Sequence, residues 1–256
     1  MRQLGRRKGI CIMKAILFVL AFGFVFIGSV SSASQDLDSA TPTITVLKRD
    51  SMSVYLLGTL HSAHLRNPNY TWPHFDRIVS LISPQLLLLE IRPEHFSSAE
   101  YFSDGPLEMA YLGHLAIAMG IESEGFDWWP DQWLLKFDQL TDADFALRDN
   151  QMAKNMVQAV RERNANTTLV ATGRDHIEPF ATELKQQGYA EEQGPTWDLM
   201  IRDYPDLPQT VLDLWQRGAK YLSGSPIASS QRTQRKIELL NRAVQSRGYL
   251  FERSPK

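Results

Sequence analysis

The run Leu86–Leu89 constrains the fold more than any other feature of this sequence. It holds four leucines in a row, and Glu90 follows directly. A strand with one face in water alternates apolar and polar residues, so an unbroken apolar run predicts a strand that is covered on both faces. Such a strand requires a sheet with helices on both sides.

The flanking segments extend this prediction to a whole domain. Residues 43–47 and 53–58 are β-rich and are separated by a short polar turn, which predicts a hairpin. Further strands are expected at residues 122–127 and 168–172. Helical spacing or capping residues occur in segments 75–83, 108–119, 131–140, 142–163, 178–187, 209–222 and 230–247. This alternation predicts an α/β (α+β) fold, with a central mixed, largely parallel sheet covered by helices and preceded by the N-terminal hairpin.

Residues 1–33 have the composition of an export signal. They carry five basic residues and no acidic one, and an uncharged apolar run over residues 15–30 ends in the small residues Ser31, Ser32 and Ala33. We expect a signal peptide cleaved after Ala33, an exported (periplasmic or extracellular) protein, and one mature domain over residues 34–256. An uncleaved membrane anchor is the alternative. The single cysteine, Cys11, precedes the apolar run, so the mature chain has no thiol for catalysis or disulfides.

The charge of the mature chain limits the classes of partner that the protein is expected to bind. Without residues 1–33 the chain has 22 basic and 29 acidic residues, a formal net charge of −7. Nucleic acids and anionic membranes select basic surfaces. We therefore expect a small-molecule or peptide substrate and no nucleic acid, with membrane contact only through an uncleaved leader.

Two strands end in the same glycine-to-histidine spacing. Gly58 is followed by His61 after the strand at 53–58, and Gly173 is followed by His176 after the strand at 168–172. Ligands of open α/β sheets gather at the carboxyl ends of strands, where glycine permits close approach. If the two strands are neighbours, both imidazoles lie at one site.

Three charged residues complete the candidate set. A carboxylate directly after a buried strand needs a partner, which singles out Glu90. On the helix over 142–163, Asp149 interrupts an apolar face and Arg148 lies at the edge of that face. Arg148 could bind a substrate carboxylate or Glu90, and Asp149 could hold a histidine ring, although a purely structural Arg–Asp pair is the alternative.

These residues are compatible with two chemistries. His61, Glu90 and His176 could hold a divalent metal with positions open for water. Alternatively, one histidine acts as a general base and Glu90 orients it. His64 and Asp175 are secondary candidates, and the cluster formed by tryptophans 128, 129 and 133 is either packing or a ligand platform.

The ordered motifs of residues 54–190 resemble the TraB/PrgY/GumN family, which includes the Tiki proteases and is similar to the erythromycin esterases and ChaN haem-binding proteins. The matching pieces are the two glycine-to-histidine motifs, the strand ending in Glu90, and the helix that carries Arg148. The resemblance implies catalytic roles for His61, Glu90, Arg148, Asp149 and His176, with Gly58, Gly173 and Arg148 beside the substrate. It implies a Tiki-like metal site (Mn, Co or Zn) at His61, Glu90 and His176. The Arg148–Asp149 pair is closer to the esterases, in which a histidine activates water without metal.

We therefore expect an exported hydrolase that attacks an amide or ester with activated water. Two alternatives remain: a ChaN-like haem- or metal-binding protein without turnover, and a regulator that kept the fold without activity. Residues after 195 match no motif of the family and give no prediction beyond two helices.

Overall fold

The computed structural model describes residue 37 and residues 39–97, 105–134, 136–194, 196–201 and 203–251. These residues belong to one compact unit, Ser34–Lys256. The predicted signal peptide and its cleavage point lie outside the described residues. Within the described part of the chain, no helix has both the length and the apolar character that crossing a membrane requires.

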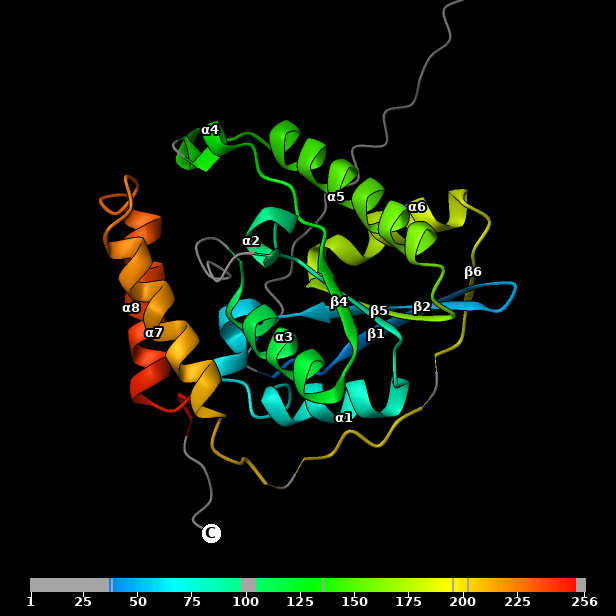
Figure 1. Cartoon of the computed structure of the whole chain (residues 1–256), viewed down its shortest axis with the longest axis horizontal. Helices are drawn as coiled ribbons and strands as arrows, with labels where there is room; N and C mark the ends of the chain where they lie inside the picture. Colours follow the sequence, from blue (N-terminus) through cyan, green and yellow to red (C-terminus); the bar gives the residue numbers. More distant parts are fainter. Residues whose placement is uncertain are drawn as a thin grey trace, which may run out of the picture. The chain divides into compact units, whose positions relative to one another are not determined.

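The centre of the unit is a six-stranded mixed sheet with the order β4-β3-β5-β2-β1-β6 (Figure 1). Its strands are β1 (Thr43–Arg49), β2 (Met52–Thr59), β3 (Leu86–Leu89), β4 (Glu122–Gly125), β5 (Thr167–Gly173) and β6 (Ala190–Glu192). The four strands β4, β3, β5 and β2 run parallel, and β1 is antiparallel to both β2 and β6. The predicted α/β class, the largely parallel sheet and the N-terminal hairpin β1–β2 are confirmed.

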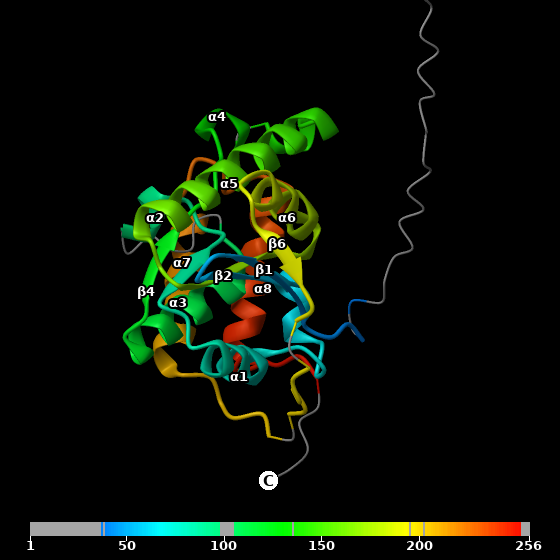
Figure 2. The same cartoon turned by 90° about the vertical axis from the view of Figure 1, so that its right-hand side faces the viewer.

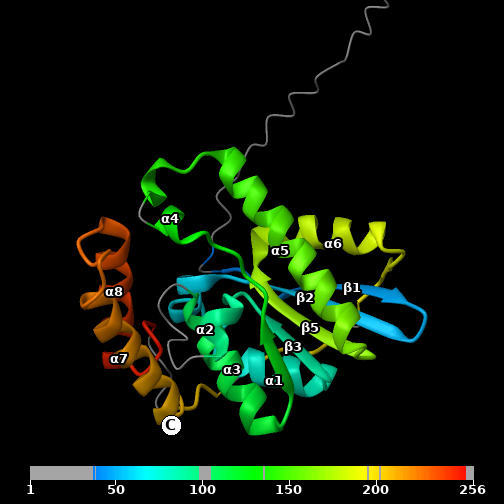
Figure 3. The same ribbon diagram turned by 45° about the horizontal axis from the view of Figure 1, so that its top comes forward.

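Helices cover both faces of the sheet. They are α1 (Trp72–Ile82), α2 (Pro93–Ser97), α3 (Leu107–Met119), α4 (Asp131–Leu134), α5 (Asp142–Arg163), α6 (Ile177–Gln186), α7 (Gln209–Ser223) and α8 (Gln231–Gln245). Figures 1 and 2 show α5 and α6 on one side of the strands and α1 on the other. Figure 3 shows α7 and α8 side by side next to α3.

The four leucines of β3 divide between two cores, as a strand covered on both faces must. Leu87 and Leu89 pack in the core that contains α1, α3 and α7. Leu86 and Leu88 pack in the core that contains α5 and α6. All four side chains are completely buried, and each one removed from water stabilises the fold by about 1.5–3 kcal/mol.

Capping residues in the sequence explain where α5, the helix that carries Arg148 and Asp149, begins. α5 begins at a capping box in which the Thr141 side chain accepts from the Asp144 amide and the Asp144 carboxylate accepts from the Thr141 amide. The single helix expected over 131–140 is wrong: α4 ends at Leu134, and a short 3-10 turn follows at Phe137–Gln139. Aromatic packing overrides helical propensity here, because the Phe137 ring packs on Trp129 and Phe145.

Candidate functional site

The candidate residues meet at the carboxyl edge of the parallel strands. β2 and β5 are neighbours in parallel register, and Thr59 pairs with Gly173 at their ends. β3 lies on the other side of β5, and the Glu90 amide that follows it bonds to the Ala171 carbonyl. The two glycine-to-histidine motifs therefore follow adjacent strands, with Glu90 beside them.

Both imidazoles converge on Gly173. A β-carbon added to Gly173 would lie 2.7 Å from Nε2 of His61 and 3.3 Å from Cδ2 of His176. Real β-carbons do not tolerate the first of these distances, so only glycine leaves room for both rings. Gly58 differs, because a β-carbon there would meet Arg174 and Ile177 at an ordinary 3.4 Å. Gly58 thus lies against the turn that follows β5.

His61 forms a pair with Glu108 of α3. Nδ1 of His61 lies 2.9 Å from the Glu108 carboxylate, whose side chain is completely buried while that of His61 is 46% exposed. Burial disfavours the imidazolium, but the Glu108 charge and hydrogen bond outweigh it and raise the pKa of His61 to about 9. The backbone of His61 has φ 52°, a left-handed conformation that is costly for a residue other than glycine. Strain of this kind persists where the surrounding structure fixes a side chain.

His176 forms a second pair, with Asp149 of α5. Its Nδ1 lies 2.9 Å from the Asp149 carboxylate, and the ring stacks on Phe180. Burial again opposes protonation, but Asp149 and Glu90 outweigh burial and raise the pKa of His176. The site thus holds two imidazoles, each oriented by its own carboxylate.

Glu90 and Arg148 form a buried network beneath the two rings. The Glu90 carboxylate accepts from the Thr172 hydroxyl at 2.9 Å, the Gly173 amide at 2.6 Å and Nη2 of Arg148 at 2.9 Å. Arg148 also donates through Nε and Nη2 to Asp127, at 3.1 and 2.8 Å. Burial alone would raise the pKa of the Glu90 carboxyl, but the charges of His61, His176 and Arg148 and the Gly173 amide lower it.

The orientation of α5 differs from the sequence prediction. Arg148, expected at the edge of the apolar face, is buried with 7% of its side chain exposed, whereas Asp149 lies at the rim with 26% exposed. The inversion has a physical reason: Asp127 and Glu90 neutralise the guanidinium, and Trp129 covers it at 4.5 Å from the ring centre. Nη1 of Arg148 lies 3.3 Å from Nε2 of His176. The guanidinium is therefore directed at protein groups.

The donor set does not fit the metal site expected at His61, Glu90 and His176. Both Glu90 oxygens already accept hydrogen bonds, and a cation near His176 would meet the Arg148 guanidinium. Within the described ranges, no three His, Cys, Asp or Glu side chains are grouped as metal ligands would be.

The secondary candidates lie outside this arrangement. His64 is completely buried, accepts from the Leu60 amide and bonds to the Tyr70 carbonyl, and burial lowers its pKa to about 4. It is a neutral structural residue. Asp175 is exposed on the turn before His176. Trp129 packs on Arg148, so at least this ring of the tryptophan cluster serves packing.

Sequence reasoning missed three partners: Glu108, Asp127 and Thr172. Glu108 had a detectable signal, because it is an acid in an otherwise apolar helix and faces the core. Asp127 follows β4 by two residues, as Glu90 directly follows β3, and the same reasoning about strand ends applies to it. Thr172 carried no distinguishing pattern.

No family model, curated protein or solved structure matches this chain. The resemblance to the TraB/PrgY/GumN family therefore stays a prediction.

Proposed function

We propose that this chain is a hydrolase that cleaves an ester or amide with water activated by histidine and without a metal. One observation carries the proposal: two imidazoles, each held by its own carboxylate, converge on a glycine that leaves space for both. Paired groups of this kind supply general acid and base on either side of a reacting bond.

In this proposal His61 is the general base. Its Nδ1 is held by Glu108, and nearly half of its side chain is exposed, which leaves Nε2 for a water molecule. Nε2 takes a proton as the water oxygen bonds to the carbonyl carbon. The Glu108 carboxylate then stabilises the imidazolium that forms.

His176 is the general acid. Nε2 of His176 lies 3.6 Å from the Glu90 carboxylate as well as 3.3 Å from Nη1 of Arg148, and the carboxylates of Asp149 and Glu90 keep the net shift of the His176 pKa upward. The protonated ring donates a proton to the leaving oxygen or nitrogen as the bond to the carbonyl carbon breaks. Asp149 holds the ring in place. Glu90 and Arg148 are positioning residues, because their polar atoms bond to protein groups around the two histidines.

The same residues and the leader also bear on the type of hydrolase and on where the protein acts. The poor fit of His61, Glu90 and His176 to a metal, with both Glu90 oxygens engaged in hydrogen bonds, favours an esterase-like route over the Tiki-like metallopeptidase route. The basic and apolar leader supports export to the periplasm or the exterior, and N-terminal sequencing of the secreted protein should begin at Ser34.

A panel of chromogenic esters and peptide amides tests the proposal. We expect the mature protein to hydrolyse at least one ester, and His61→Ala and His176→Ala each to lower kcat/KM by at least about 100-fold, the usual contribution of a general acid or base. Asp175→Ala is the matched control: it lies on the same turn as His176, is exposed, and should keep full activity. Equal activity of His61→Ala and wild type, or a His61-dependent absorbance shift on haem addition, would reject the hydrolase.

A further inference from the structure

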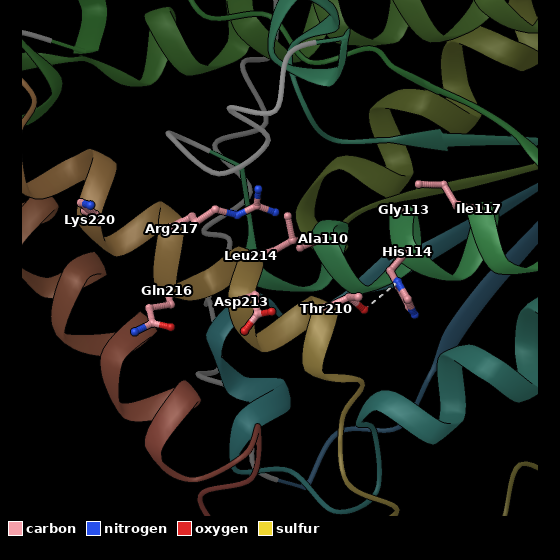
Figure 4. A pocket seen from close by; sticks show the side chains of 10 residues that line it. All are labelled: Ala110, Gly113, His114, Ile117, Thr210, Asp213, Leu214, Gln216, Arg217 and Lys220. Carbon is pink, nitrogen blue, oxygen red and sulfur yellow. Dashed lines mark hydrogen bonds between the residues drawn. The ribbon is translucent and has the colours of Figure 1, made fainter.

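A groove between α3 and α7 lies outside the candidate catalytic site. It has a volume of about 860 Å³, within the range of small-molecule sites. Its apolar lining comes from Ala110, Gly113 and Ile117 of α3 and from Leu214 of α7 (Figure 4). Ile117 is 77% exposed there, an unusual state for a large aliphatic side chain on an apolar helix.

The groove has a direction, because α3 and α7 run antiparallel. The Thr210 hydroxyl lies 3.1 Å from Nδ1 of His114, whereas Nε1 of Trp215 donates to the Leu107 carbonyl. Later residues of α7 therefore lie beside earlier residues of α3. This places the Ile117 end of the groove beside the start of α7, and the opposite end beside its later turns.

Two cations mark that opposite end. Arg217 and Lys220 line the groove from α7, and Figure 4 shows them at the other end from Ile117. Neither makes an ion pair or side-chain hydrogen bond with any residue that the structure describes. The one acid of the lining, Asp213, already accepts from Nε2 of Gln209. The groove is thus locally cationic in a mature domain of formal net charge −7.

We propose that this groove binds an amphiphile with an anionic head and a linear apolar tail, of the class of long-chain carboxylates. The tail lies along Ala110, Gly113 and Leu214 towards Ile117, where burial removes apolar surface from water. The head lies between Arg217 and Lys220, whose donors match a carboxylate. This inference does not depend on the hydrolase proposal, since it uses none of the residues of that site.

Calorimetric titration of the mature protein with dodecanoate, below its micelle concentration, tests the proposal. We expect one site per chain, and affinity that rises about twofold to fourfold for each methylene added between octanoate and dodecanoate. Dodecyltrimethylammonium, which has the same tail and the opposite charge, should bind at least about tenfold more weakly. Equal affinity for the two amphiphiles, or no binding of dodecanoate, would overturn the proposal.

Variants locate the site. The double variant Arg217→Glu, Lys220→Glu should weaken dodecanoate binding about tenfold or more, as two reversed surface charges predict. Ile117→Asp should weaken it by introducing a charge beside the tail. The matched control is Arg235→Glu, which reverses a charge on α8. Arg235 lines a separate surface hollow. Unchanged dodecanoate affinity in the first two variants would contradict the assignment of the groove as the binding site. A dimer that is seen by sedimentation and disrupted by Ile117→Asp would also contradict it.

Discussion

At the scale of single residues, the candidate site depends on what surrounds Gly173. The sequence shows two glycine-to-histidine motifs, but only the fold shows that both rings lie against the second glycine. His61 reaches this place through a left-handed backbone that its contacts must stabilise. Glu108 supplies such a contact from a different helix.

Gly173→Ala tests this crowding directly. Its methyl group would lie 2.7 Å from Nε2 of His61, so the ring must move while the strand stays in place. A displacement of about 1 Å in catalytic geometry costs on the order of 100-fold in rate. We expect kcat/KM to fall by about that factor with a free energy of unfolding within about 1 kcal/mol of wild type. Full activity in this variant would show that the two rings do not share the site.

Glu108→Gln tests the first imidazole pair through pH dependence. His61 acts as a base only when it is unprotonated, which gives kcat/KM a rising limb governed by the His61 pKa of about 9. His176 acts as an acid only when it is protonated, so a falling limb should follow the loss of its proton. Removing the Glu108 charge should move this rising limb to lower pH, towards the ordinary histidine range. A rising limb that Glu108→Gln leaves at the same pH would contradict the role of His61 as the base.

At the scale of elements, a buried ion network joins β3, the segment after β4, and α5. Arg148 is shared between Glu90 and Asp127, and all three side chains are at least 93% buried. A buried pair adds little compared with apolar packing, but its rupture leaves an uncompensated charge. The network thus makes the placement of α5, and with it Asp149, dependent on one guanidinium.

Arg148→Met removes the guanidinium that Glu90 and Asp127 share. The buried carboxylates of Glu90 and Asp127 then lose the guanidinium that neutralises them and keep only hydrogen bonds such as those from the Gly173 and Trp128 amides. We expect a loss of about 3–5 kcal/mol in the free energy of unfolding measured with urea. Arg163→Met is the control on the same helix. Arg163 pairs with Glu122 and Glu124 at the surface, where such pairs contribute about 0–1 kcal/mol. Similar losses in both variants would contradict the structural role of Arg148.

For individual elements, the sequence predicts the position of some correctly and the orientation of α5 wrongly. Local signals were sufficient for β3, with its four leucines, and for the start of α5, with its Thr141 capping box. They failed for the rotation of α5, because Arg148 is buried by partners that lie 21 and 58 residues earlier in the chain. A helical wheel of α5 alone shows neither Asp127 nor Glu90.

At the scale of the whole unit, α7 and α8 belong to the main core. Trp215 of α7 is completely buried there, and Nε1 of Trp72 donates to the Gly248 carbonyl after α8. The segment after residue 195, for which the sequence predicted only two helices, therefore packs against α1 and α3. Its helix α7 also forms one wall of the groove that Ile117, Arg217 and Lys220 line. Strand order, too, was an assumption from sequence, since it is decided by contacts between distant segments.

Imidazole titration by heteronuclear NMR tests the central claim most directly, with resonances assigned from His61→Gln and His176→Gln. The account predicts that His61 titrates near pH 9, that His176 titrates above its ordinary value of 6.5, and that Glu108→Gln lowers the pKa of His61. It also predicts that replacing either histidine shifts the titration of the other, because both rings lie against Gly173. Two histidines that titrate independently near pH 6.5 would contradict a shared site.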